Sequence, residues 1–130
     1  MLQRIKKLLE HNALAIAIIT TLAIALLSLS HLPKLDFGIK IKSSDKYLHA
    51  IAYFFLSVVW YFALRKKITN KKFKVLLILF LIIYGIILEA LQGGLTNYRT
   101  ADLYDVAANS FGILIATLVI NKILNWYHTI

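Results

Sequence analysis

Four long apolar stretches, separated by short polar segments, constrain the fold of this chain more than any other feature. They cover about residues 13–29, 48–64, 75–91 and 106–124. Each approaches the length of about 17–25 residues that a helix needs to cross the hydrocarbon core of a bilayer. The pattern predicts an all-α fold, a four-helix transmembrane bundle that occupies residues 1–130 as a single domain.

The composition agrees with a membrane location and excludes several other classes of protein. Of the 130 residues, 60% are hydrophobic and only 16% are charged. A soluble domain has about 25% charged residues, and at this size it would leave much of such an apolar surface in water. The absence of cysteine excludes disulfides, thiolate metal ligands and a catalytic thiol.

Basic residues predict the orientation of the bundle. With the N-terminus in the cytoplasm, ten Lys and Arg residues fall on the inner side and five on the outer side. The outer set is Lys34, Lys40, Lys42, Lys46 and Arg99. This asymmetry follows the positive-inside rule, so both termini are expected to be cytoplasmic in a multi-pass protein of the bacterial cytoplasmic membrane. The net charge of +9 is thereby attributed to topology and anionic lipid rather than to nucleic acid.

The first apolar stretch is interpreted as a retained helix rather than a signal peptide. Its core is longer than the 7–15 residues typical of a signal peptide, and no A-x-A cleavage site follows it.

Three groups of polar residues gather at the predicted outer ends of the last three helices. Spacings of three or four residues place the members of each group on one helix face. The groups are Asp45, His49 and Tyr53, then Glu89 and Gln92, then Asp102, Asp105 and Asn109, with Arg99 in the loop between the last two. Because the helices are antiparallel neighbours, the three groups lie at one depth. The sequence therefore predicts a polar pocket that opens to the outer surface.

Glu89 is the strongest sign of such a pocket, because it ends the apolar run YGIILEALQ. An ionised carboxylate inside a membrane is costly, so it usually faces the bundle interior or a wet cavity and has a partner. His49 and Arg99 are the expected cations. Gly112 and Ala116 form a small-xxx-small pair that is typical of closely packed membrane helices.

A structural interpretation of the same residues stays open. Asp45, Asp102 or Asp105 can serve as helix N-caps, and Asn109 can form a hydrogen bond between helices. The polar residues would then clamp the helices together without binding a ligand.

Three kinds of chemistry are compatible with the pocket. Asp, Glu and His bind divalent metals, but no ligand spacing such as H-E-x-x-H is present, so neither a metal nor another cofactor is expected. A histidine with a carboxylate partner can perform acid–base hydrolysis or transfer on a phosphorylated lipid, although no nucleophile motif is present and no catalytic residue is assigned. The pocket can also bind a lipid headgroup or a cell-wall precursor without chemistry, and Arg99 suits a phosphate or carboxylate.

The motifs Asp45-Lys46-x-x-His49-x-x-x-Tyr53, Glu89-x-x-Gln92, Arg99 and Asp105-x-x-x-Asn109-x-x-Gly112 occur together between about residues 43 and 120. In this combination the chain resembles the VanZ-like family of bacterial membrane proteins. The family is named for an accessory protein of glycopeptide resistance, associated with teicoplanin. The resemblance implies a role in the cell envelope for seven residues of these motifs only: Asp45, His49, Glu89, Gln92, Arg99, Asp105 and Asn109. Ala116 departs from the family where a second glycine is expected.

The favoured expectation is a VanZ-like membrane protein whose outward-facing pocket binds a lipid-linked or cell-wall-related ligand, in connection with glycopeptide resistance. The expected partners are membrane lipids and a lipid-linked precursor or a glycopeptide, and no nucleic acid. A membrane enzyme acting on a phosphoryl-lipid and a structural or assembly protein are the two alternatives.

Overall fold

The computed structural model describes residues 1–29, 44–95 and 102–130. The described residues form four helices and no strand: α1 (Leu2–Leu29), α2 (Ser44–Ala63), α3 (Lys71–Leu95) and α4 (Leu103–Thr129). Each of these helices is long and apolar enough to cross a membrane. The predicted all-α fold is therefore confirmed, and the four apolar helices are those of a multi-pass membrane protein.

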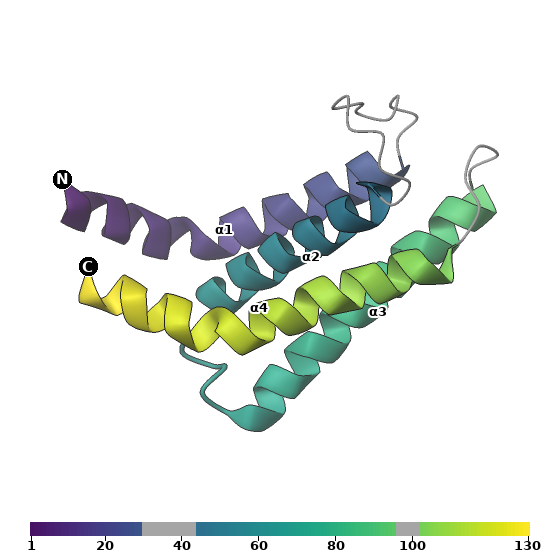
Figure 1. Cartoon of the computed structure of the whole chain (residues 1–130). Helices are drawn as coiled ribbons and strands as arrows, with labels where there is room; N and C mark the ends of the chain where they lie inside the picture. The colour runs from purple at the N-terminus through teal and green to yellow at the C-terminus, as the bar shows by residue number, and fades with distance from the viewer. Residues whose placement is uncertain (30–43, 96–101) are drawn as a thin grey trace.

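The helices alternate in direction along the chain. Figure 1 shows both termini at one end of the bundle, together with the turn that joins α2 to α3. We call this end the terminal end, and the opposite end, where α2 and α4 begin, the distal end. The predicted inner and outer sides correspond to the terminal and distal ends, while the orientation in the membrane stays a prediction.

The helices are longer than the apolar stretches from which they were predicted. Helix α1 begins at Leu2 rather than near residue 13, and α3 continues through two glycines to Leu95. The first turns of α1 are rich in Leu, Lys, Arg and Glu, which all favour helix. The apolar pattern ends at the boundary between membrane and water, whereas a helix can continue into water as long as its residues favour helix.

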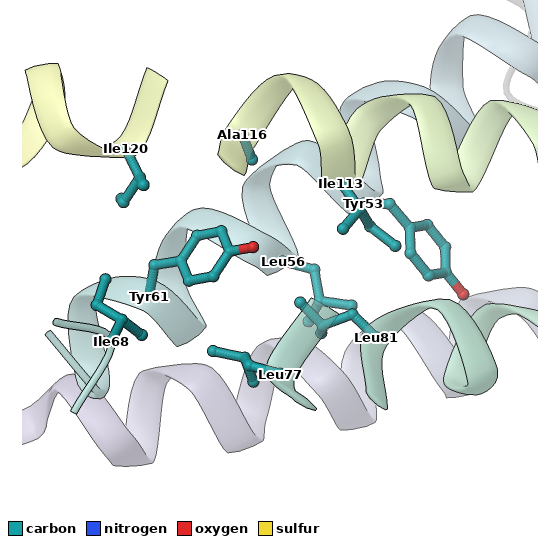
Figure 2. Close-up of a cluster of buried hydrophobic side chains, with 9 residues drawn as sticks. All are labelled: Tyr53, Leu56, Tyr61, Ile68, Leu77, Leu81, Ile113, Ala116 and Ile120. Atoms are coloured by element: carbon teal, nitrogen blue, oxygen red, sulfur yellow. The ribbon is translucent and has the colours of Figure 1, made fainter. Parts of the chain in front are cut away.

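The core lies mainly between α2 and α4, which make the most extensive contact in the bundle. Figure 2 shows side chains of both helices and of α3 pointing into this core, with Leu56, Ile113 and Ile120 fully buried. Tyr61 is also fully buried, and its hydroxyl forms a hydrogen bond with Thr117 Oγ1 at 2.5 Å. A polar contact inside the apolar core thus fixes the register of α2 against α4.

Gly112 sets the distance between these two helices. A Cβ atom at this position would lie 2.1 Å from the carbonyl oxygen of Ala50 and 3.0 Å from the backbone nitrogen of Phe54. Ala116, one turn further along α4, is also completely buried. The predicted small-xxx-small pair therefore lies on a packing face, and Gly112 meets the backbone of α2 there.

Helix α1 packs against α2 and α3 with few buried side chains and is joined to both by hydrogen bonds. Only Ala13 and Ala17 of this helix are buried, and most of its large apolar side chains are exposed. The indole nitrogen of Trp60 donates to Thr21 Oγ1 at 2.9 Å, and the hydroxyl of Tyr84 donates to the carbonyl oxygen of Thr21 at 2.5 Å. One residue thereby connects α1 to both α2 and α3.

Candidate functional site

Polar side chains from α2, α3 and the start of α4 meet at the distal end. We call this group the distal cluster; its members are Lys46, His49, Glu89, Asp102, Asp105 and Asn109. Five of the six belong to the site predicted from the sequence, and Lys46 does not. The contacts below describe how these three chain segments combine.

Among the described residues, Lys46 pairs with the carboxylates at the start of α4. Its ammonium nitrogen donates to Asp102 Oδ2 at 3.2 Å and lies 3.6 Å from Asp105 Oδ1. The sequence places Lys46 among the outer basic residues and within the first motif, but the expected cations of the pocket are His49 and Arg99. The signal that could have found it is its spacing of three residues before His49, which puts both side chains on one face of α2.

Asp102 is the N-cap of α4, as the structural interpretation of the sequence anticipates. The backbone N–H of Tyr104 donates to Asp102 Oδ1 at 2.8 Å, and Asp102 has the extended backbone that is typical of this position. This hydrogen bond, with the neighbouring Lys46, holds the pKa of the Asp102 carboxyl below its ordinary value of 3.8. Asp102 therefore has two functions at once, because it both caps α4 and pairs with α2.

His49 lies between two oxygen-bearing side chains of α4. Its Nδ1 atom is 3.1 Å from Asn109 Oδ1, and its Nε2 atom is 3.7 Å from Asp105 Oδ2. The Asn109 side chain is buried, whereas His49 and Asp105 stay partly accessible. With Nδ1 protonated, the imidazole donates to the amide oxygen and turns its other nitrogen towards the carboxylate.

Glu89 of α3 meets the first residues of α4. Its side chain is 5% exposed, and Glu89 Oε1 accepts a hydrogen bond from the backbone N–H of Asp102 at 2.6 Å. A carboxylate is favourable beside a helix N-terminus, where backbone N–H groups lack partners within the helix. Within the described part of the chain, the buried acid predicted from the sequence thus has a backbone N–H as its hydrogen-bond partner.

Tyr53 and Gln92, which the sequence assigns to the same site, have other surroundings. Tyr53 belongs to the apolar core (Figure 2). Its ring centroid lies 6.3 Å from that of Tyr84. The amide nitrogen of Gln92 donates to the carbonyl oxygen of Ser28 at 2.7 Å, so this bond connects α3 to α1. Tyr53 therefore packs in the core beneath the distal cluster, whereas Gln92, three residues beyond Glu89, joins the ends of α3 and α1.

Two predicted site residues cannot be described in the same way. Asp45 is the second residue of α2, but its side chain lies outside the described part of the chain. The whole of Arg99 lies outside it, as do Lys34, Lys40 and Lys42. Among the described residues, no group of three or more His, Asp or Glu side chains could hold a metal ion.

A further polar contact at the terminal end was not predicted. The Tyr127 hydroxyl donates to Glu10 Oε1 at 2.9 Å, and the guanidinium of Arg65 lies 3.9 Å from the same oxygen. This contact joins Glu10, Arg65 and Tyr127, which are far apart in the sequence, and no spacing pattern in the sequence indicates it.

Comparison of the chain with known protein families, with curated proteins and with solved structures found no match.

The lowered pKa of Asp102 predicts how acid affects stability. A carboxyl whose pKa is depressed by folding stabilises the protein above its unfolded-state pKa, and this contribution is lost as the pH falls through the folded-state value. We expect the melting temperature in detergent to fall below about pH 4, and to fall less in Asp102→Asn. Asparagine is an equally good N-cap but cannot form the ion pair with Lys46. Equal acid sensitivity of the two proteins would show that Asp102 contributes nothing to it.

Proposed function

We propose that this chain is a VanZ-like protein of the bacterial cytoplasmic membrane whose distal cluster binds the polar part of a lipid-linked or cell-wall-related ligand. The observation that carries the proposal is the uneven burial of the cluster. The side chains of Lys46 and Asp102 are 39% and 40% exposed, whereas Glu89 and Asn109 are 5% and 3% exposed. The opposite charges of Lys46 and Asp102 thus stay accessible, whereas the more buried Glu89 and Asn109 are held in place by hydrogen bonds.

The chemistry of the cluster fits a ligand that carries both an acceptor and a donor. The ammonium of Lys46 can meet a phosphate or carboxylate, as a compact point charge. The carboxylates of Asp102 and Asp105 can accept hydrogen bonds from an amine or from sugar hydroxyls. Lipid-linked cell-wall precursors and glycopeptides such as teicoplanin combine these groups, which connects the proposal to the theme of the VanZ-like family.

A second candidate function is favoured by the surroundings of His49. An imidazole held by Asn109 and turned towards Asp105 has the arrangement of a general acid–base residue. In that case the cluster would activate water for hydrolysis of a phosphoryl-lipid. The purely structural alternative rests on the same contacts, because Glu89 and Asp102 already join α3 to α4.

The test is a thermal-shift measurement on the purified protein in detergent. The probes are undecaprenyl phosphate, undecaprenol without the phosphate, and teicoplanin. A ligand at about 100 times its Kd stabilises the folded state by roughly 2.7 kcal/mol. We expect such a shift with undecaprenyl phosphate or teicoplanin in the wild type, and its loss in Lys46→Gln. Lys72→Gln is the matched control, because Lys72 begins α3 at the terminal end.

The outcomes separate the three functions. No shift with any probe, or the same shift in Lys46→Gln as in the wild type, would contradict binding at the distal cluster. Release of phosphate from undecaprenyl diphosphate, lost in His49→Gln, would favour the enzyme. A fall in melting temperature in Lys46→Gln without any ligand effect would favour the structural role.

A further inference from the structure

An apolar groove lies on the bundle near the terminal end, away from the distal cluster. It has a volume of about 220 Å³ and is lined by three helices. Its floor is α2, and its two walls are α1 and α4. Six of its lining residues are Ala13 and Ile16, Val58 and Phe62, and Ile123 and Leu124. A groove of this volume with a wholly apolar lining suits part of one flexible hydrocarbon chain.

A second hollow of about 280 Å³ adjoins this groove at the terminal end. Its lining includes three consecutive basic residues, Arg65, Lys66 and Lys67, together with Glu10. The guanidinium carbon of Arg65 lies 4.9 Å from the centre of the Phe62 ring, which belongs to the groove. The apolar and the basic hollows therefore share a boundary at the end of α2.

A second contact fixes the same boundary from the other side. Tyr127, which lines the apolar groove, donates its hydroxyl hydrogen bond to Glu10, which lines the basic hollow. The rings of Tyr127 and Phe62 are in edge-to-face contact, with centroids 4.9 Å apart and planes at 86°. This side of the boundary is thus built from aromatic and hydrogen-bonded contacts between α1, α2 and α4.

The charges of the basic hollow do not balance. The carboxylate of Glu10 lies 3.9 Å from Arg65, and the two lysines add two further positive charges beside this pair. Lys66 and Lys67 are both exposed, so their ammonium groups are accessible at the membrane surface. An anionic group fits this position, and a cationic or neutral group does not.

We infer that the two hollows together form a binding site for one anionic phospholipid, with an acyl chain in the apolar groove and the phosphate on Arg65, Lys66 and Lys67. Lipid tails are as apolar as the groove, so contact with the chain alone gives little preference for this site over the bulk bilayer. Selectivity must then come from the headgroup, at a place where basic residues attract anionic lipid. This site is independent of the function proposed for the distal cluster.

The headgroup part of the proposal is tested by native mass spectrometry of the full chain released from detergent. The probes are phosphatidylglycerol and phosphatidylcholine with identical acyl chains. We expect phosphatidylglycerol to be retained preferentially, and Lys66→Gln with Lys67→Gln to reduce its retention about fivefold or more. The matched control is Lys71→Gln with Lys72→Gln, which removes the same charge from exposed positions outside the hollow. Equal losses in the two double variants, or equal retention of the two lipids, would overturn the proposal.

The groove is tested by filling it with a larger side chain. Ile16→Trp is expected to lower retention of phosphatidylglycerol, because Ile16 lines the groove. Ile19→Trp, on an exposed position outside it, is expected to have no effect. Leu9→Trp provides a second filled groove if the first variant fails to fold. Unchanged retention in a folded groove variant would overturn the placement of the acyl chain. A concentration-dependent dimer that only the groove variants abolish would show that a second copy of the chain occupies the groove instead.

Discussion

Of the substitutions that add a single methyl group to this protein, Gly112→Ala is expected to destabilise the fold the most. The new Cβ would lie 2.1 Å from the carbonyl oxygen of Ala50, and its other near neighbours are also backbone atoms of α2. Backbone cannot turn aside as a flexible side chain can, so α2 and α4 must separate along their whole contact. Overpacking a core costs about 1–3 kcal/mol and occasionally more, and we expect a loss of at least about 3 kcal/mol here.

The measurement is the melting temperature and the yield of monodisperse protein in one detergent. Gly94→Ala is the matched control, because nothing lies within 4 Å of a Cβ atom at that position of α3. Since alanine favours a helix over glycine by about 1 kcal/mol, this control is expected to be neutral or slightly stabilising. Similar melting temperatures for the two variants would mean that α2 and α4 do not approach as closely as described.

Glu89 is expected to give the second largest effect, and two substitutions separate its charge from its hydrogen bond. Alanine leaves the N–H of Asp102 without its acceptor in a buried place, which costs about 1–3 kcal/mol, and adds a small cavity. Glutamine keeps an acceptor oxygen but loses the charge. Because charge-assisted hydrogen bonds are about twice as strong as neutral ones, we expect Glu89→Gln to lose only about 1 kcal/mol.

Ligand binding gives the second measurement on these variants. If the distal cluster requires a carboxylate for function, Glu89→Gln stays folded but loses the thermal shift that the wild type shows with its ligand. Glu10→Gln, a half-exposed acid at the terminal end, is the control and should keep that shift. Unfolding of Glu89→Gln would instead favour the structural role and would contradict the modest stability loss given above.

The sequence predicts the fold and most of the distal cluster for the same reason. Apolar stretches of membrane-spanning length allow few arrangements other than a helical bundle, and antiparallel neighbours bring Glu89, Asp105 and Asn109 to one end. The side-chain pairings are harder to predict, because they depend on how each helix is rotated about its axis. Gln92 is an example: it shares a face with Glu89 by spacing, yet its amide nitrogen donates to the carbonyl oxygen of Ser28 at the end of α1, whereas Glu89 accepts from the start of α4.

Lys46 was missed for a different physical reason. A basic residue at a membrane boundary is normally a topology signal, since many lysines there only contact water and lipid headgroups. What distinguishes Lys46 is that α2 begins at Ser44, before the apolar stretch, so its side chain lies on a helix face opposite Asp102 and Asp105. The spacing of Asp45, His49 and Tyr53 already implies that early start, but it does not show how α2 is rotated, and the rotation decides whether Lys46 meets the acids of α4.

The pairing of α2 with α4 has a consequence for biogenesis. These helices share the largest contact, but α3 is made between them and α2 is complete long before its main partner leaves the ribosome. Until then the hydroxyl of Tyr61 has no Thr117 to bond to, and the face of α2 that will receive Gly112 contacts lipid or the insertion machinery. The bundle must therefore finish its assembly after insertion. The core that α2 begins is complete only when α4, the last helix, has entered the membrane.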